Sequence, residues 1–258
     1  MGILNVTPDS FSDGGCFPDS EAALRKALKL VEEGADILDI GAESTRPGAL
    51  PVTEQEELGR LLPVLNLIRK EILVPLSIDT VRPEVARQCL DNGADIINDV
   101  SGLKRSGSEM ARIVGGFGAG LVLMHSRGTP ETMQPLTDYG DVISDVISEL
   151  RESIRIATDA GLDPEHLAVD PGFGFAKTAK QNLEILKKIN MFQVLGFPVL
   201  AGPSRKSFIG HVTGRETAGR EFGTAACVAA CVTAGVQIVR VHDVGAMRDV
   251  VRMTEAIQ

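Results

Sequence analysis

Polar side chains recur at the ends of short apolar runs along this chain of 258 residues. Eight runs carry a hydrogen-bonding residue at or just past their end. These residues are Asn5, Asp39, Asp79, Asn98 with Asp99, His125, Asp170, the group at 204–206, and Arg240 with His242. One such residue alone is commonly the cap of a following helix. Eight together predict one polar site, provided that the runs are strands whose ends meet at one face.

The charges of these residues indicate two kinds of ligand group. Carboxylates and amides suit a planar heterocycle with adjacent N–H donors, because a carboxylate accepts two parallel hydrogen bonds. They are found at Asp39, Asp79, Asn98 and Asp170. Cationic residues suit phosphate or diphosphate; they are Arg46, Arg205, Lys206, Arg240 and His242. Residues 204–207 also open an expected helix, where free N–H groups favour an anion.

Three loops rich in Gly and Pro are expected to complete the site, at residues 7–15, 43–48 and 171–175. Such loops allow the backbone to approach a ligand closely. Phe11 and Phe175 lie on two of them, and an exposed loop Phe needs a packing partner. We expect them to clamp an aromatic substrate, with local packing of the loop as the alternative.

The elements that position these residues alternate between strand and helix. The apolar runs predict strands at residues 3–6, 37–40, 75–78, 96–98, 121–124, 167–169, 199–201 and 238–241. Continuous apolar strands separated by helices are typical of a covered parallel sheet. Eight such units in this length favour a single (β/α)8 TIM barrel, forming one domain over residues 1–258. The first strand is not followed by a GxGxxG turn, which disfavours a dinucleotide-binding fold.

A helix–Gly–strand unit is repeated. Gly34, Gly93 and Gly235 each end an amphipathic segment and precede an apolar run, which predicts left-handed helix caps. Two apolar stripes have helical spacing. One is formed by Leu24, Ala27, Leu28 and Val31, and the other by Ile143, Val146, Ile147, Leu150 and Ile154.

Composition narrows the functional class. The net charge of −9 argues against nucleic acid as a partner. No apolar run reaches the roughly 20 residues of a membrane span, so we expect no membrane association and a cytoplasmic location. Cys227 and Cys231 lie one helical turn apart without a second ligand pair nearby, and we interpret them as buried apolar residues rather than metal ligands.

Several long motifs resemble those of the dihydropteroate synthase family, which has a pterin-binding TIM barrel. The motifs are GILNVTPDSFSDGG (2–15), DIGAESTRPG (39–48), SIDT (77–80), IND (97–99), LMH (123–125), DPGFGF (170–175), SRKS (204–207) and RVHD (240–243). They occur in order over essentially the whole chain. The resemblance implies a transferase that joins 6-hydroxymethyl-7,8-dihydropterin diphosphate to p-aminobenzoate, releasing diphosphate and 7,8-dihydropteroate for folate biosynthesis, and it implies a sulfonamide target.

The resemblance also implies residue roles. The pterin would contact Asp79, Asn98, Met124, Asp170 and Lys206. The diphosphate would contact Asn5, Arg46, Arg240 and His242, with Asn5 also binding Mg²⁺. The p-aminobenzoate pocket would be framed by Phe11, Thr45, Pro47, Phe175, Arg205 and Ser207, together with Arg46. Asp79, Asp170 and Lys206 are the expected catalytic residues.

These roles predict a mechanism without a covalent enzyme intermediate. As diphosphate leaves, the pterin ring delocalises a positive charge, which Asp79 and Asp170 would stabilise. Mg²⁺, Arg240 and His242 would neutralise the leaving group. By resemblance we also expect a homodimer. Members of the family commonly carry a segment ahead of the first strand, whereas here Met1 and Gly2 directly precede it.

Three other functions are consistent with some of these features. A pterin-barrel methyltransferase acting on methyltetrahydrofolate shares the fold and the pterin pocket. A Schiff-base aldolase could use Lys206, if its neighbour Arg205 lowers the lysine pKa. A pterin-binding module without turnover would need only the pocket. The motifs at 45–47 and 204–207 favour the synthase.

Overall fold

The computed structural model describes residues 1–7, 20–44 and 48–258. Six parallel strands form one sheet in chain order, and two more form a second pair. The strands are β1 (Gly2–Asn5), β2 (Leu38–Gly41), β3 (Leu76–Asp79), β4 (Ile96–Asp99), β5 (Gly120–Met124), β6 (Leu167–Asp170), β7 (Leu200–Ala201) and β8 (Ile238–Val239). All eight predicted strands are therefore present, with ends shifted by one or two residues.

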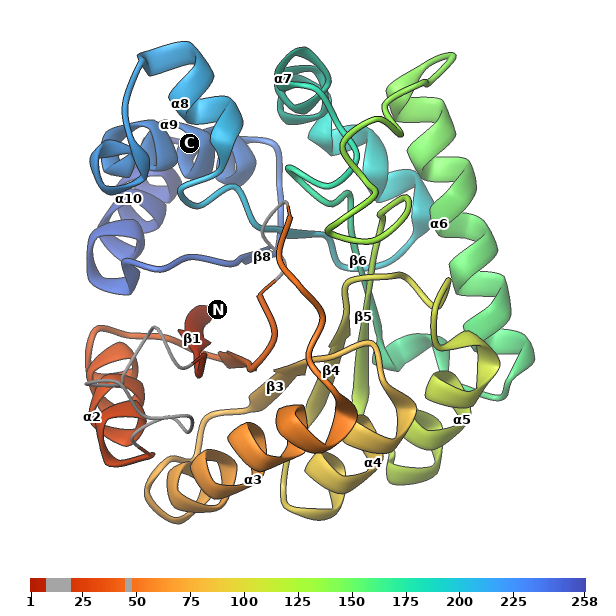
Figure 1. The fold of residues 1–258 in the computed structure, drawn as a ribbon. Coiled ribbons are helices and arrows are strands. Elements are labelled where there is room, and N and C mark those ends of the chain that lie inside the picture. Colours follow the sequence, from red (N-terminus) through yellow and green to blue (C-terminus); the bar gives the residue numbers. More distant parts are fainter. Residues whose placement is uncertain (8–19, 45–47) are drawn as a thin grey trace.

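Two parallel bridges close the strands into a barrel. Val169 pairs with Val199 between β6 and β7, and Gly2 pairs with Val241 between β8 and β1. Backbone hydrogen bonds support the second junction, with Ile3 N donating to Val241 O at 2.9 Å and Val241 N to Met1 O at 3.0 Å. Figure 1 shows the strands at the centre and the helices around them. The (β/α)8 barrel expected from the sequence is confirmed.

The helices cover the outside of the strands. They are α2 (Ser20–Glu32), α3 (Glu54–Glu71), α4 (Pro83–Asp91), α5 (Gly107–Phe117), α6 (Val142–Asp159), α7 (Ala179–Lys187), α8 (Ser207–Thr213), α9 (Glu221–Thr233) and α10 (Val244–Ile257). Short 3-10 helices lie at Pro164–His166, Ile189–Leu195 and Thr217–Gly219.

Local sequence explains where these helices begin and end. Thr53 and Glu56 form a capping box at the start of α3. The three predicted glycine caps are confirmed, since Gly34, Gly93 and Gly235 have φ values of 98°, 91° and 79°.

The prediction of an apolar stripe is correct for α6 and partly wrong for α2. On α6 the stripe faces the core as expected, with Ile143, Val146, Ile147 and Leu150 buried and Ile154 partly buried. On α2 the prediction is wrong at Leu28, which is 42% exposed. The buried face of α2 is centred on Ala23, Ala27 and Leu30 instead. Small Ala side chains allow this helix to approach the strands closely.

Strand register decides which side chains point into the barrel. Ile3, Asp39 and Ser77 are paired across β1 to β3, and every second residue along each strand shares their side of the sheet. An apolar cluster of these inward residues fills the barrel near the strand starts. Its members are Met1, Val122 and Leu200, with Ile37, Ile96, Ala168 and Ile238 packed against them. The next inward positions toward the strand ends are polar.

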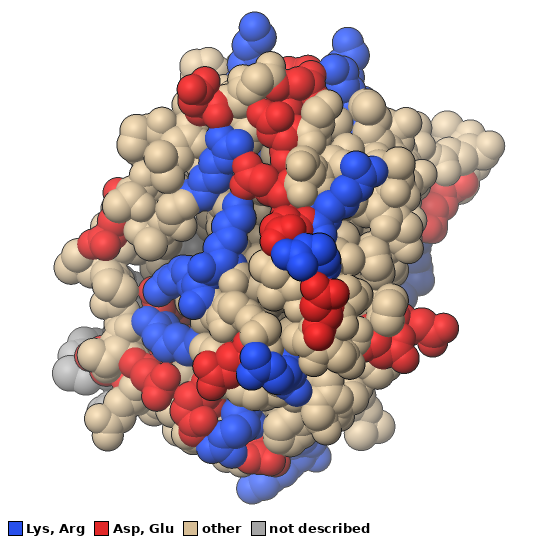
Figure 2. Space-filling model, turned by 90° about the vertical axis from the view of Figure 1, so that its right-hand side faces the viewer, with Lys and Arg blue, Asp and Glu red and all other residues tan. Residues whose placement is uncertain are grey.

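The outer surface carries charges of both signs. On the side that includes α6, basic and acidic side chains are interspersed (Figure 2). On α6 itself, Arg155 pairs with Glu152 and Asp159. In the described part of the chain, no helix combines the length and the apolar character that a membrane crossing requires. Cys227 and Cys231 are buried free thiols of α9, as interpreted from the sequence.

Candidate active site

The inward polar positions of the strands converge on Asp39, which is fully buried in β2. Its carboxylate accepts hydrogen bonds from Ser77 Oγ at 2.6 Å, Asn98 Nδ2 at 3.2 Å and Arg240 Nε at 2.6 Å. The donors come from β3, β4 and the end of β8. Asp39 therefore organises the floor of the site, and its oxygens are occupied by the protein itself.

Arg240 connects this floor to Asp79. Its Nη2 donates to Asp79 Oδ2 at 3.2 Å, while Nε binds Asp39. The two carboxylates hold the pKa of Arg240 above its usual value, although burial acts in the opposite direction. Arg240, which the resemblance assigns to diphosphate binding, is thus a guanidinium paired with two carboxylates.

Two carboxylates at strand ends are poised to titrate near neutral pH. Burial raises the pKa of Asp79 to about 7, and the charge of Arg240 offsets only part of this effect. Burial likewise raises the pKa of Asp170 to about 6, against a hydrogen bond from Gly172 N at 2.7 Å and the charge of Lys206. Carboxylates with shifted pKa values at the strand ends of a barrel are typical of functional sites.

The raised pKa values predict a loss of activity in mild acid. If both carboxylates must be ionised to stabilise a developing positive charge, kcat/KM for the pterin substrate should fall as pH decreases through 7 and 6. A pH profile of kcat/KM between pH 5 and 9 measures this, with circular dichroism checking the fold at each pH. Activity that stays constant down to pH 5 would contradict the requirement.

Asn98 presents an unsatisfied acceptor to the site. Its Nδ2 donates to Asp39, whereas its buried Oδ1 has no hydrogen-bond partner in the described structure. A buried polar atom without a partner is costly unless a ligand or water satisfies it. This oxygen is therefore available to a ligand N–H group, as expected for the pterin.

Lys206 and Phe175 form one wall. The Nζ atom of Lys206 lies 4.4 Å from the centroid of the Phe175 ring, a cation–π geometry. Burial, followed by the charge of Arg240, lowers the pKa of Lys206 to about 8. The sequence indicated the direction of this shift, but the cation that adds to the effect of burial is Arg240 and not Arg205. The amine remains mostly charged at pH 7.

Phe175 shows the local packing that the sequence left open as the alternative to clamping an aromatic substrate. The residue is 8% exposed and packs against Met124 and Met133. It nevertheless lines a pocket together with Asp79, Val100 and Met133. Concave sites lined by apolar side chains with a few polar groups are typical of small-molecule binding.

The residues after β7 and β8 bind one another. Ser204 Oγ lies 2.9 Å from His242 Nδ1 and accepts a hydrogen bond from His242 N at 3.2 Å. Arg205 donates to both carboxylate oxygens of Asp243, at 2.7 Å and 2.8 Å. Ser207 is exposed at the start of α8.

His242 is not the cation that the sequence suggested. Burial and the charges of Arg205 and Arg240 lower its pKa to about 4, so the imidazole is neutral at pH 7. Ser204 Oγ accepts from the backbone N–H of His242 and lies within hydrogen-bond distance of Nδ1, so the Ser204 hydroxyl can donate to Nδ1. In that tautomer the ring proton resides on Nε2, where it can be donated to an anion.

Several expected residues lie outside the described part of the chain: Phe11, Thr45, Arg46 and Pro47. Two other strand-end residues do not face the site. Asp99 accepts hydrogen bonds from the turn that follows it, including Ser101 Oγ at 2.6 Å. His125 contacts Lys177 and Glu149, which sequence reasoning missed because neither lies at a strand end.

The fold and this set of side chains agree with a known class of enzyme. Residues 1–242 match the family described as pterin binding enzyme. Because the match covers most of the chain, the protein is a member of the pterin-binding enzymes.

Relatives that match the full length of this chain show to which kind of pterin-binding enzyme it is similar. The chain is 46% identical to dihydropteroate synthase of Synechocystis, covering 100% of this chain and 89% of the relative. It is 45% identical to dihydropteroate synthase of Bacillus subtilis, covering 100% and 87%. A structure of the Xanthomonas albilineans synthase with 4-aminobenzoic acid has 44% identity and a TM-score of 0.93, covering 100% and 92%. The chain belongs to the dihydropteroate synthase family, transferases of folate biosynthesis.

Proposed function

We propose that Asp79, Asn98 and Asp170 bind the pterin of 6-hydroxymethyl-7,8-dihydropterin diphosphate. The observation that carries the proposal is the unpartnered Asn98 Oδ1 beside carboxylates of raised pKa. The oxygen accepts one ring N–H, and Asp170 accepts adjacent donors. A structure of the Xanthomonas albilineans synthase in complex with 7,8-dihydropteroate, at 41% identity and a TM-score of 0.90, supports this choice of ligand.

In this proposal the chain stabilises charge and positions two substrates. Asp79 and Asp170 face the positive charge that develops on the pterin as the diphosphate bond breaks. Lys206 and Phe175 confine the ring from one side. The amine of p-aminobenzoate then attacks the methylene carbon and loses one proton, so positioning matters more than deprotonation by the enzyme.

On the anionic side, Arg240 and the Nε2–H group of His242 face the departing diphosphate. Among the described residues, no group of three His, Cys, Asp or Glu side chains is placed to hold a metal ion. The half-buried amide of Asn5 fits Mg²⁺ only as one protein ligand beside substrate phosphates, which is an ordinary arrangement for this ion. When bound, Mg²⁺ supplies charge neutralisation of the diphosphate.

The p-aminobenzoate site is proposed at the wall formed by Phe175, next to Arg205 and Ser207. The loops at 7–15 and 43–48 would complete it through Phe11, Thr45, Arg46 and Pro47. A structure of the Yersinia pestis synthase in complex with a sulfonamide drug, at 38% identity, supports competition by sulfonamides at this site. We further propose a cytoplasmic homodimer.

Release of diphosphate tests the function. Mixing the protein with the pterin diphosphate, p-aminobenzoate and Mg²⁺ should release one diphosphate for each dihydropteroate formed. Removal of Mg²⁺ with EDTA should lower the rate at least tenfold, since a charged leaving group loses its counter-ion.

Three outcomes would contradict the function or its metal requirement. Methyl transfer from methyltetrahydrofolate without diphosphate release would assign the chain to the methyltransferases. An unchanged rate in EDTA would exclude the metal role. Borohydride trapping of a carbonyl substrate on Lys206 would instead support an aldolase.

A further inference from the structure

The Lys177 amine is buried behind the loop that follows β6. Its Nζ atom donates to Gly172 O at 3.0 Å and to Phe175 O at 3.0 Å, and it lies 2.9 Å from His125 Nδ1. An ammonium group has three N–H donors, and this site offers three acceptors. The amine therefore binds both ends of the segment 172–175 and connects this segment to His125, which follows β5.

His125 extends this connection to α6. Its Nε2 atom lies 3.2 Å from Glu149 Oε2. Burial, followed by the charge of Lys177, lowers the pKa of His125 to about 3, so the ring is neutral. A neutral ring that accepts from Lys177 at Nδ1 must carry its proton on Nε2 and donate it to Glu149. Only one tautomer satisfies both partners.

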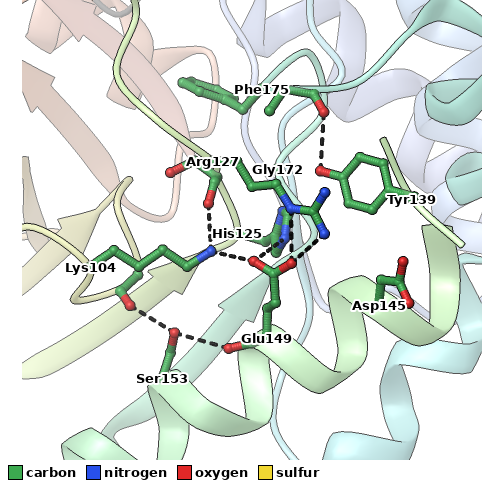
Figure 3. A network of polar contacts seen from close by, with 12 residues as sticks. Lys104, His125, Arg127, Tyr139, Asp145, Glu149, Ser153, Gly172 and Phe175 are labelled. Carbon is green, nitrogen blue, oxygen red and sulfur yellow. Dashed lines mark hydrogen bonds and ion pairs between the residues drawn. The ribbon is translucent and has the colours of Figure 1, made fainter. Parts of the chain in front are cut away.

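Glu149 is held as a carboxylate by further donors (Figure 3). Arg127 donates to Oε1 at 2.9 Å and 2.6 Å, and Lys104 donates to Oε2. These bonds and that of His125 outweigh burial and hold the pKa of Glu149 well below its usual value. Tyr139, which lies under the Arg127 guanidinium, donates to Ala176 O at 3.0 Å.

The loop held in this way carries part of the proposed pterin pocket. Gly172 N donates to Asp170 Oδ1, and Phe175 packs against Lys206. The loop has little space to move, since a Cβ atom on Gly172 would lie 2.0 Å from His125 O. A Cβ atom on Gly174 would lie 3.1 Å from Lys206 Cδ. A shift of the loop would therefore change how Asp170 and Lys206 face a ligand.

We propose that Glu149, His125 and Lys177 act in series as positioning residues, which fix the loop 171–176 and with it the geometry of Asp170 and Phe175. The inference rests on the proposed function of the pocket. None of the three residues needs to touch a substrate. Their effect is transmitted through the backbone of the loop.

The charge of Lys177 depends on the groups around it. Burial lowers its pKa to about 7, and Lys104 and Arg127 add to this effect. Asp170 and Glu149 act in the opposite direction and favour the ammonium form. As pH rises through this value, Lys177 loses a donor and the loop loses a hydrogen bond. Removing the negative charge of Glu149 should move that loss to lower pH.

Kinetics of matched variants test the proposal. Lys177→Met and Glu149→Gln should each lower kcat/KM for the pterin substrate, by about tenfold for Lys177→Met, the effect of about 1.4 kcal/mol. The same substitutions at exposed residues, Lys188→Met and Glu152→Gln, should leave it within about twofold. In the wild-type protein, kcat/KM should decline at high pH as Lys177 loses its charge. In Glu149→Gln this decline should begin at a lower pH than in the wild type, whereas in Glu152→Gln it should not move. Glu149→Gln kinetics and a pH profile identical to those of Glu152→Gln would overturn the proposal.

The tautomer of His125 gives a test that does not depend on activity. In ¹⁵N spectra of the four histidines, His125 should remain neutral and protonated at Nε2 from pH 5.5 to 8. Protonation at Nδ1, or titration near pH 6.5, would overturn the network even if Lys177→Met fails to fold. If wild-type protein shows the expected tautomer but forms no dihydropteroate, the proposed function fails while the network stands.

Discussion

Asp79→Asn is expected to lower kcat by about 10²–10³-fold, the effect of removing one preorganised electrostatic contact from a transition state. Asn has nearly the shape of Asp but no charge, so it cannot stabilise a positive pterin. The hydrogen bond to Arg240 can still be accepted by the amide oxygen. Binding of inorganic diphosphate, measured by its inhibition constant, should change much less, because Arg240 and His242 are retained.

Asp91→Asn is the matched control for this substitution. Asp91 ends α4 and forms an exposed ion pair with Arg87, so loss of its charge should leave kcat unchanged. Single-turnover measurements of diphosphate release separate the chemical step from product release. Equal losses in kcat and in diphosphate affinity would contradict a role for Asp79 in charge stabilisation.

The sequence was sufficient to predict the barrel and the face that carries the site. Apolar runs separated by amphipathic helices have a strong and regular signal, and the period of two along a strand brings Asn5, Asp39, Asp79, Asn98 and Asp170 to inward positions near the strand ends. The glycine caps followed from a conformation that only Gly adopts without strain. These features depend on local chemistry.

Pairing between distant side chains could not be predicted. Arg240 lies 201 residues from Asp39 in sequence, and only the closed barrel brings them together. The neutral state of His242 depends on burial and on the charge of Arg205, which follows another strand, as well as on the charge of the nearby Arg240. Lys177 and Glu149 carry no motif signal, since each acts through a residue from another element.

Arg240→Met should lower the free energy of unfolding by about 3–5 kcal/mol, which is the usual effect of leaving buried charges without their partner. Asp39 has no exposed surface, and the side chain of Asp79 is 11% exposed. Methionine fills most of the arginine volume, so the change isolates charge. Urea unfolding at pH 8 measures it. Arg155→Met on α6 removes an exposed arginine that also pairs with two carboxylates. This control should change the free energy of unfolding far less, because exposed ion pairs contribute little to stability.

The pH dependence of this loss distinguishes charge from packing. Without Arg240, the folded-state pKa of Asp79 rises further above the unfolded value, because the opposite charge that favours its ionised form is removed. A raised folded-state pKa means that the destabilisation is present at high pH and is relieved as pH falls through that pKa. Arg240→Met should therefore lower the free energy of unfolding more at pH 8 than at pH 6. Adding Asp39→Asn to Arg240→Met should restore part of this free energy at pH 8. A deficit that is equal at both pH values, and that Asp39→Asn does not reduce, would show that Arg240 stabilises the barrel through its volume alone.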